Sequence, residues 1–193
     1  MNPILASGSQ IRRAMLSAAG IEHRVVRPDV DEGAVKRRLD QAETIASELA
    51  AAKALSVSET VPEAWVIGSD SVVEVDGRLF DKPGSREEAA EHLRFFSGKT
   101  MRLTSAVALA RSRSLDWRHV DRAELSIRPL SEDFIKTYLD AEWPEVAYCV
   151  GVFRMEGRGV QLFSAIKGSH FTILGMPLLP LLGALREREV VPS

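Results

Sequence analysis

One stretch of the chain, residues 65–83, combines a buried strand, a tight turn and several ionisable side chains. Its apolar run at 65–67 predicts a strand, which the valines of residues 72–75 resume after the polar segment 68–71. Asp76-Gly77 then follows, and this dipeptide is typical of a two-residue hairpin turn because glycine adopts positive φ without a steric penalty. We therefore expect a hairpin whose first strand carries polar side chains.

Asp70 lies in this strand region, where a buried charge is costly unless it is paired. Gly68 and two serine hydroxyls surround it, and the charged pair Asp81-Lys82 follows on the return side of the hairpin. This setting is typical of a carboxylate that binds a metal ion or activates water. A strand-end aspartate that only caps local N–H groups would give the same pattern. On the residues alone, both interpretations remain open.

The composition is that of an ordinary globular chain of 193 residues, with 45% hydrophobic and 27% charged residues. This length suffices for one substantial core or for two small lobes. The formal net charge of −2 provides no positive field for nucleic acid or acidic membranes, so a polyanion must be held by a local site. The single cysteine excludes an internal disulfide. No segment has the pattern of a signal peptide or a membrane span, so we expect a cytoplasmic protein.

The first part of the chain predicts a phosphate-binding helix terminus. A short apolar strand ends in small polar residues, and a helix is expected from about 10 to 19, with Ser9 as its N-cap. Ser7 and Ser9 offer hydroxyls, and Arg12 and Arg13 lie in the first turns. Free backbone N–H groups, hydroxyls and guanidinium groups together attract phosphate. The alternative is a surface helix whose first turn happens to carry cations.

An acidic pair, Asp31-Glu32, follows a second strand expected at 22–30. The pair either coordinates Mg²⁺ or begins the next helix, because acids favour the positive end of the helix dipole. An alanine-rich helix is expected at about 44–56, with Lys53 in its last turns. A lysine there ordinarily complements the helix C-terminus, so the pattern alone gives it no further role.

The rest of the chain continues to alternate between helices and strands, which predicts one α/β domain over residues 1–193 with a mixed sheet. We interpret Cys149 and His170 as structural, because neither has partners at metal-ligand spacing. The segment 97–100, Ser-Gly-Lys-Thr, is not the end of a P-loop, since the first glycine of that motif would fall on Leu93 inside a helix. The expected elements are a helix at 85–96 capped by Ser85, strands at 101–110 and 117–128, a helix at 131–140 and a C-terminal helix from 177.

Several short motifs, in their order and spacing, resemble those of the Maf (septum-formation-like) nucleotide pyrophosphatases nearly from end to end. The motifs are Leu5-Ala6-Ser7-Gly8-Ser9, Arg12-Arg13, Asp31-Glu32, Ala52-Lys53-Ala54, Gly68-Ser69-Asp70, Asp81-Lys82-Pro83, Ser97-Gly98-Lys99-Thr100 and Gly175-Met176-Pro177-Leu178. The resemblance implies a two-lobed α/β fold, with a long twisted mixed sheet flanked by helices and a cleft between the lobes, similar to the inosine triphosphate pyrophosphatases. It also implies a homodimer that hydrolyses a nucleoside triphosphate to a monophosphate and pyrophosphate with Mg²⁺ or Mn²⁺.

The same resemblance implies a role for each candidate residue. Asp70 is expected to be the general base that positions water, and Asp31 and Glu32 are expected to bind the metal ion together with Asp70. Lys53 thereby gains a role that its pattern alone does not indicate. The residues expected to contact the substrate phosphates are Lys53, Lys82, Ser7, Ser9, Arg12 and Arg13.

The expected substrate depends on three base-sensing positions, which are Ile11, Ser71 and Glu156 in this chain. The branch similar to dTTP and UTP pyrophosphatases has Arg, Thr and Gln there. The branch similar to 7-methyl-GTP pyrophosphatases has an acidic residue in a context close to residues 153–157. A carboxylate accepts hydrogen bonds from the N–H edge of guanine and complements the positive charge of an N7-methylated base. Glu156 therefore favours a methylated purine, whereas Ile11 and Ser71 match neither branch.

Three alternatives to a 7-methyl-GTP pyrophosphatase follow from these observations. The first is a dTTP or UTP pyrophosphatase, and the second is a nucleotide-binding or nucleic-acid-binding regulator of cell division without turnover. The third is a phosphomonoesterase, which would release orthophosphate. The paired acids and lysines favour an enzyme, because a binding protein has less need of a second carboxylate facing a polyanion.

Overall fold

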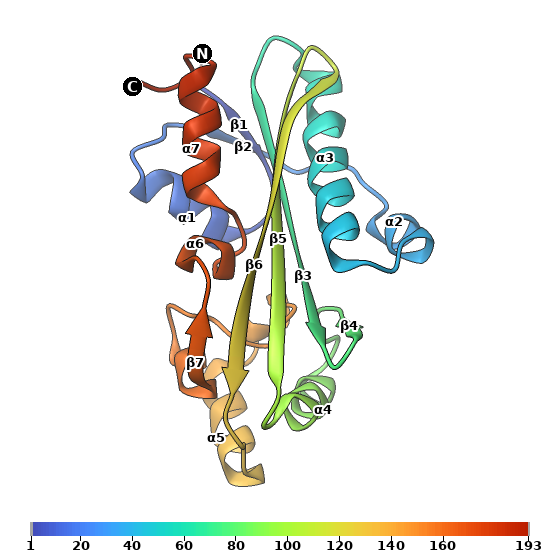
Figure 1. Ribbon diagram of the computed structural model, residues 1–193, viewed down its shortest axis with the longest axis vertical. Coiled ribbons are helices and arrows are strands. Elements are labelled where there is room, and N and C mark those ends of the chain that lie inside the picture. The colour runs from blue at the N-terminus through green and yellow to red at the C-terminus, as the bar shows by residue number, and fades with distance from the viewer. Residues whose placement is uncertain (1, 193) are drawn as a thin grey trace. The chain divides into compact units, whose positions relative to one another are not determined.

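The computed structural model describes residues 2–192 and contains a seven-stranded mixed sheet flanked by helices (Figure 1). The strand order is β2-β1-β3-β5-β6-β7, and β4 pairs with β3. β1 is parallel to β2 and to β3, whereas β4 on β3 and β7 on β6 are antiparallel, which confirms the expected mixed sheet. The strands are β1 (Ile4–Ala6), β2 (Arg24–Val26), β3 (Val66–Val75), β4 (Arg78–Phe80), β5 (Thr100–Arg111), β6 (Ser114–Ile127) and β7 (Phe163–Lys167).

Serine side chains cap three of the helices, and two of these caps, Ser9 and Ser85, are predicted from the sequence. Ser9, Ser85 and Ser131 each accept a hydrogen bond from a backbone N–H in the first turn of the helix that follows. None of the described helices is long and apolar enough to cross a membrane. The helices are α1 (Gln10–Ala18), α2 (Glu32–Arg38), α3 (Ala42–Thr60), α4 (Arg86–Phe96), α5 (Glu132–Glu142), α6 (His170–Ile173) and α7 (Leu178–Glu187), with 3₁₀ helices η1 (Glu145–Tyr148) and η2 (Arg158–Leu162).

The chain forms two compact units, each assembled from separate segments. The first unit comprises the described residues up to Ser71, the segment Thr104–Asp121 and those from Ser169 onward. The second unit comprises Val72–Leu103 and Arg122–Gly168. Three of the four boundaries fall within β3, β5 and β6, so these three strands contribute residues to both units. The fourth lies between β7 and α6.

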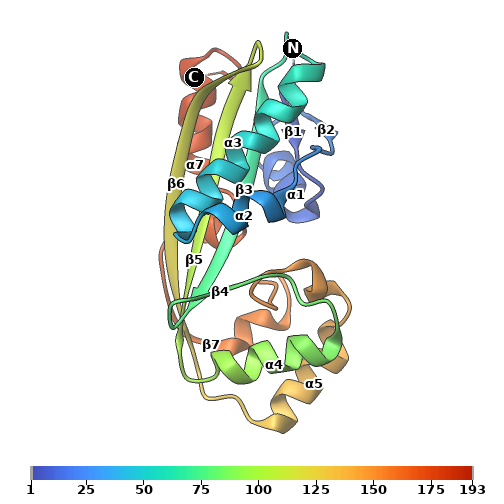
Figure 2. The ribbon, with the colours of Figure 1, turned by 90° about the vertical axis from the view of Figure 1, so that its right-hand side faces the viewer.

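In the first unit, helices cover both faces of the strands. Leu5 of β1, Ile67 of β3 and the apolar residues of β5 pack with Leu16 of α1 and Leu181 of α7. The long helix α3 lies on the opposite side of β3 (Figures 1 and 2). Its backbone is so close to Gly68 that a Cβ there would lie 2.1 Å from the carbonyl oxygen of Ala50. The first unit is therefore a helix–sheet–helix sandwich.

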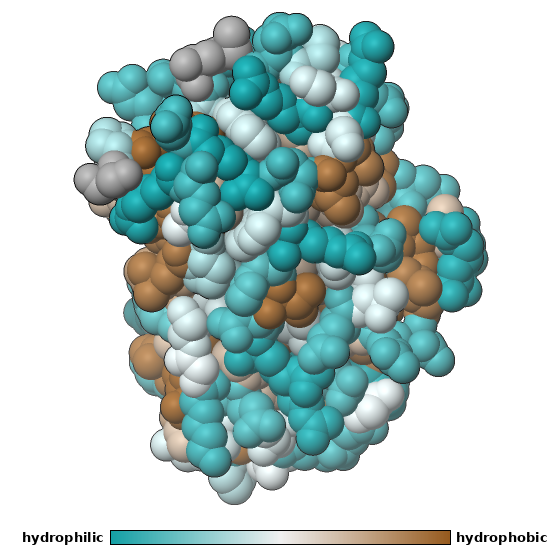
Figure 3. Space-filling view, turned by 45° about the horizontal axis from the view of Figure 1, so that its top comes forward, coloured by the Kyte–Doolittle hydropathy of each residue, from teal (hydrophilic) through white to brown (hydrophobic). Residues whose placement is uncertain are grey.

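Aromatic side chains form much of the core of the second unit, in which α4 and α5 lie side by side (Figure 2). The ring of Phe80 meets that of Phe96 edge to face at 4.8 Å, and Phe153 meets Phe163 in the same way at 4.9 Å. On the face seen in Figure 3, hydrophilic residues predominate and hydrophobic residues form small separate patches. This face carries no broad apolar area of the kind that marks an obligate interface.

Three sequence predictions about element boundaries are wrong. β3 runs without a break from Val66 to Val75, although residues 68–71 were expected to interrupt it. The polar side chains stay in the strand because Ser69 and Asp70 are buried and each has a hydrogen-bond partner. β2 is shorter than the expected 22–30, and Arg24 and Val25 are exposed. α3 is longer than 44–56 at both ends.

Candidate active site

The strand β3 directs alternate side chains to its two faces and thereby separates two polar clusters of the first unit. Gly68 and Asp70 point toward α3, because Gly68 touches its backbone and Asp70 contacts Lys53. Ser69 and Ser71 point the other way and bond to the carbonyl of Gly175, just before α7. The polar residues 68–71 thus face two different environments, one on each side of β3.

A buried lysine connects two carboxylates at the α3 face. The ammonium of Lys53 lies 2.5 Å from Oδ1 of Asp70 and 2.7 Å from Oε1 of Glu32. The side chains of Lys53 and Asp70 are 9% and 10% exposed, whereas that of Glu32 is 47% exposed. Lys53 therefore bridges the two carboxylates, and the carboxylate of Glu32 is about half exposed to solvent. Carboxylate oxygens are the protein ligands that Mg²⁺ usually takes.

Gly68 explains how Lys53 reaches Asp70. A Cβ at Gly68 would lie 2.1 Å from the oxygen of Ala50 and 2.6 Å from the nitrogen of Ala54, which real structures do not tolerate. Glycine on the strand and alanine on the helix therefore allow α3 to lie directly on β3. This role of Gly68 was not predicted from the sequence. The available signal was an alanine-rich helix together with a glycine two residues before the strand aspartate.

Asp31 does not join this cluster in the structure. It is the N-cap of α2, where its Oδ1 accepts a hydrogen bond of 2.9 Å from the backbone N–H of Ala34, and its side chain is 72% exposed. The acidic pair thus begins a helix, and only Glu32 turns toward Lys53. Among the described residues, no group of three or more His, Cys, Asp and Glu side chains is arranged to hold a metal ion.

Arg12 is the centre of the second cluster, on the opposite face of β3. Its guanidinium donates to the carbonyl of Gly175 at 2.8 Å, to the carbonyl of Ser69 at 2.9 Å and to the hydroxyl of Ser71 at 3.0 Å. Burial lowers the pKa of Arg12, and the charges of Asp70 and Glu32 oppose this effect. These contacts fasten the start of α1 to β3 and to the segment before α7.

The predicted phosphate-binding serines lie where α1 begins. The hydroxyl of Ser7 accepts a hydrogen bond from the backbone N–H of Ser9 at 3.1 Å, and Ser9 caps α1 through the backbone N–H of Arg12 at 3.4 Å. Arg13 is exposed on the same helix, and Ile11 is half-buried. The loop between β1 and α1 therefore has the local structure that the sequence predicts. Its binding of phosphate stays a prediction.

Ser71, one of the three predicted base-sensing residues, is engaged inside the first unit. Its hydroxyl lies 2.8 Å from that of Ser105 and 3.2 Å from the carbonyl oxygen of Gly175, and it accepts from Arg12. Ser105 in turn donates to the carbonyl of Thr172 at 2.8 Å. Ser71 therefore belongs to a polar network that also includes Gly175, whose importance the sequence shows only through the resemblance.

Lys82 and Glu156 belong to the second unit, where both are exposed. Lys82 follows β4, and Glu156 lies in the loop before η2. Their charges act in opposite directions on one half-buried thiol, because burial and Glu156 raise the pKa of Cys149 to about 11 while Arg154 and Lys82 lower it. A thiol with so high a pKa is protonated at neutral pH, which agrees with a structural role for Cys149.

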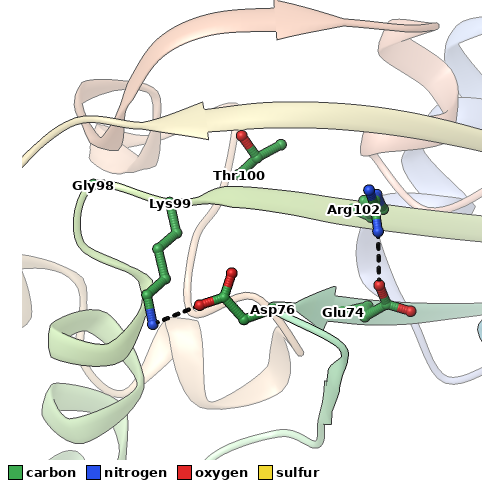
Figure 4. Close-up of a pocket in the computed structure, with 6 residues that line it drawn as sticks. All are labelled: Glu74, Asp76, Gly98, Lys99, Thr100 and Arg102. Atoms are coloured by element: carbon green, nitrogen blue, oxygen red, sulfur yellow. Dashed lines mark hydrogen bonds and ion pairs between the residues drawn. The ribbon is translucent and has the colours of Figure 1, made fainter.

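A separate polar hollow of about 310 Å³ also lies in the second unit (Figure 4). Two ion pairs line it, Lys99 with Asp76 at 3.0 Å and Arg102 with Glu74 at 3.1 Å. Gly98, Lys99 and Thr100 of the segment rejected as a P-loop form part of its wall. Because the charges on its walls are paired, it offers no excess positive charge for a phosphate group.

Comparison with known proteins places the chain. Residues 2–188 match the family described as Maf-like protein. The chain belongs to this family. A 7-methyl-GTP pyrophosphatase of Rhizobium etli is 47% identical over 188 residues, which cover 95% of this chain and 94% of that protein. A nucleoside triphosphate pyrophosphatase of Nitrobacter hamburgensis is 46% identical, over 97% of this chain and 94% of that protein.

Among solved structures, this Maf-like chain is similar to the Ham1 protein of Staphylococcus aureus. The two share 16% sequence identity with a TM-score of 0.49, over 96% of this chain and 98% of that one. The family assignment rests on the sequence comparison, which confirms the resemblance recognised in the motifs.

Proposed function

We propose that this Maf-like chain is a nucleoside triphosphate pyrophosphatase that uses a divalent metal ion and releases a monophosphate and pyrophosphate. The observation that carries the proposal is the buried Lys53–Asp70 ion pair beside the solvent-open carboxylate of Glu32. A buried ion pair loses the hydration of both charges and usually adds little stability. Buried ionisable clusters are therefore more often found at functional sites. The names of full-length relatives at 46–47% identity indicate the function of this cluster.

In the proposed reaction, Asp70 acts on the attacking water. Lys53 donates to its Oδ1 and leaves Oδ2 as the acceptor for a water proton. The water oxygen bonds to the α-phosphorus as its proton passes to Asp70, and the bond from the α-phosphorus to the bridging oxygen breaks. Pyrophosphate departs with the bonding electrons. Positioning and charge neutralisation supply most of the rate, so the remaining residues bind phosphate oxygens.

Arg12, Arg13 and the serines at the start of α1 are the proposed phosphate contacts of the first unit. Arg12 uses three of its five N–H groups on the chain itself, so it both fixes the site and offers donors to a phosphate. Arg13 is exposed and free to move toward a bound nucleotide. Lys82 of the second unit is proposed to contact phosphate because of the family resemblance.

The residues of the α3 face fit a magnesium or manganese ion. Magnesium is usually held in proteins by one or two carboxylates together with waters and substrate phosphates. Glu32 and Asp70 supply two carboxylates of one cluster. When bound, the ion would offset negative charge on the phosphate oxygens. The participation of Asp31 rests on the resemblance, because its carboxylate caps α2.

The proposed substrate is a methylated purine nucleotide such as 7-methyl-GTP. Glu156 supports this choice, because it is acidic and exposed, and because a carboxylate complements a positively charged methylated base. The name of the Rhizobium etli relative agrees with it. We further propose, from the resemblance, that the protein works as a homodimer in the cytoplasm.

The test is pyrophosphate release from dTTP, UTP, GTP and 7-methyl-GTP with Mg²⁺ or Mn²⁺. We expect release to peak on one nucleotide, to require the metal ion, and to fall by at least about a hundredfold in Asp70→Asn. Asp40→Asn, an exposed acid-to-amide change between α2 and α3, is the control and should retain full activity. Orthophosphate as the product would identify a phosphomonoesterase instead. Nucleotide binding without any turnover would favour a regulator.

A further inference from the structure

The segment that leads into η2, residues 149–157 of the second unit, adopts an unusual backbone conformation. Val152 is fully buried and has φ of +55°, a left-handed conformation that β-branched residues rarely adopt. Such a conformation is strained and persists only where the surrounding structure enforces it. Specific contacts must therefore hold this part of the chain in place.

The segment 154–158, which we call the recognition loop, closes tightly on itself. A Cβ at Gly159, directly after the loop, would lie 2.5 Å from the carbonyl oxygen and 2.6 Å from the nitrogen of Arg154, so the chain that leaves the loop lies against the backbone of its first residue. The N–H of Gly157 donates to the carbonyl of Arg154 at 3.2 Å. Glu156 projects from this turn and is exposed. The loop is thus a compact support for a single outward carboxylate.

A buried carboxylate at the end of α5 fastens the recognition loop. Glu142 is only 4% exposed. Its Oε2 accepts a hydrogen bond of 3.0 Å from Nε of Arg154 and forms an ion pair of 3.0 Å with Nη2 of the same residue. Its Oε1 accepts from the backbone N–H of Arg158 at 3.1 Å. One side chain therefore holds both ends of the loop, through charge-assisted hydrogen bonds that fix distance and direction.

Another residue of α5 holds the strained segment just before the loop. The hydroxyl of Tyr138, one helical turn before Glu142, donates to the carbonyl of Val152 at 2.9 Å. Residues four apart lie on the same face of a helix. One face of α5 thus secures Val152 through Tyr138 and the recognition loop through Glu142.

We propose that Glu142 is a positioning residue for base recognition, which fixes the recognition loop so that the carboxylate of Glu156 meets the nucleotide base. The inference rests on the proposed function. The stability of the core does not explain why Glu142 is charged, because hydrophobic residues of similar volume usually stabilise a core as well as an ion pair does. A carboxylate that binds both ends of a loop fixes the orientation of that loop. Hydrogen bonding to one edge of a base requires such a fixed orientation.

The main experiment compares Glu142→Gln with Glu132→Gln, the same change on an exposed residue of α5 that pairs with Arg94. For Glu142→Gln, we expect KM for the preferred nucleotide to rise about tenfold, with a much smaller change in kcat. A tenfold rise corresponds to the loss of roughly one charge-assisted hydrogen bond. The preference for 7-methyl-GTP over GTP should shrink. Glu132→Gln should leave KM, kcat and preference unchanged.

A double-mutant cycle separates positioning from general loosening of the fold. If Glu142 acts through Glu156, Glu142→Gln should no longer alter the preference once Glu156→Gln is present. Full additivity of the two changes would overturn the proposal. An unchanged preference in a Glu142→Gln protein with the wild-type unfolding midpoint would overturn it as well.

Gly157→Ala tests the same contact if Glu142→Gln does not fold. Its φ of −123° suits alanine, and the new Cβ would lie 3.2 Å from both carboxylate oxygens of Glu142, which must shift slightly. We expect a smaller loss of the same preference, and no loss would overturn the proposal. If the wild-type protein binds nucleotides without releasing pyrophosphate, the proposed function fails, and dissociation constants for the two nucleotides then replace KM in every comparison.

Discussion

At the scale of single residues, the buried charges of this protein are paired, and the pairs mark its candidate functional positions. Lys53 is held between Asp70 and Glu32 in the first unit, and Glu142 holds Arg154 in the second. Removing one partner of a buried pair leaves an uncompensated charge, which is far more destabilising than removing both. Comparing single with double substitutions therefore shows how much each ion pair contributes to stability and to activity.

Lys53→Met should both destabilise the protein and stop turnover. We expect a loss of about 3 kcal/mol in the free energy of unfolding, because Asp70 stays buried without its cation. Adding Asp70→Asn should recover much of that stability and none of the activity. Urea unfolding and pyrophosphate release measure the two effects. Lys136→Met, on an exposed lysine of α5, is the control. Equal stability of the single and double variants would contradict this account.

His92 should make stability depend on pH. Its Nδ1 is buried without a hydrogen-bond partner among the described residues, and its ring meets that of Phe80 at 5.0 Å. Burial lowers the pKa of His92 below its usual 6.5, and Glu88 and Glu91 oppose this effect. The unfolded chain therefore binds the proton more tightly, so stability is complete above pH 6.5 and declines as the pH falls toward the lowered pKa.

The pH effect is measured by urea unfolding between about pH 7.5 and pH 5. In His92→Leu, the decline in stability toward low pH should be smaller than in the wild type. His170→Leu, a change at an exposed histidine of α6, should leave the decline as it is. Parallel curves for the wild type and His92→Leu would show that another group carries the pH dependence.

At the scale of secondary-structure elements, the site depends on how closely α3 lies on β3. Lys53 reaches Asp70 because Gly68 lets the helix backbone approach the strand. The alternation of β3 then decides which polar residues meet α3 and which meet Arg12. The distance between two elements, set by one missing methyl group, thus positions the proposed general base.

Gly68→Ala should disrupt this contact. The added Cβ would lie 2.1 Å from the carbonyl oxygen of Ala50, so α3 must move away from β3. We expect a loss of at least about 2 kcal/mol in the free energy of unfolding, with reduced turnover. Gly183→Ala in α7 is a matched control, since nothing lies within 4 Å of its new Cβ. It should stabilise the protein by about 0.5–1 kcal/mol, as is usual in helix interiors. Equal effects of the two changes would contradict this assignment.

Local signals in the sequence predicted the element boundaries that short-range chemistry decides. The serine caps of α1 and α4 and the Asp76-Gly77 turn were predicted, because each depends on hydrogen bonds or φ angles within a few residues. The break expected in β3 is absent, because partners distant in the sequence satisfy its polar residues: Ala106 for Ser69 and Lys53 for Asp70. Local pattern cannot reveal such partners.

The sequence predicted several residues of the candidate site but not the contacts between them. Asp70 and Glu32 come together, but through Lys53, whose position in an alanine-rich helix suggested no such role. Arg12 was predicted to bind phosphate, and its contacts with Ser69, Ser71 and Gly175 could not be foreseen because they join distant segments. Glu142 escaped notice because nothing in its local sequence shows that it is buried.

At the scale of the whole molecule, the two units are linked by three uninterrupted strands. β3, β5 and β6 each contribute residues to both units. Strand pairing in either unit therefore requires the same three strands to be extended, and a change that unfolds them in one unit removes the support for the other. This continuity predicts that the chain unfolds as one cooperative body, although it has two compact units.

The three tryptophans test this prediction, because Trp65 and Trp117 belong to the first unit and Trp143 to the second. In a Trp65→Phe, Trp117→Phe protein, Trp143 fluorescence reports on the second unit alone. Gly68→Ala, a change in the first unit, is then added to this protein. It should lower the urea midpoint measured by Trp143 fluorescence as much as the midpoint measured by far-ultraviolet circular dichroism, which reports on the whole chain. A Trp143 transition that stays in place while the circular dichroism splits into two steps would show independent unfolding. Coincident transitions would mean that a substitution beside Asp70 weakens the recognition loop as well, so stability and substrate preference must be measured together in every variant.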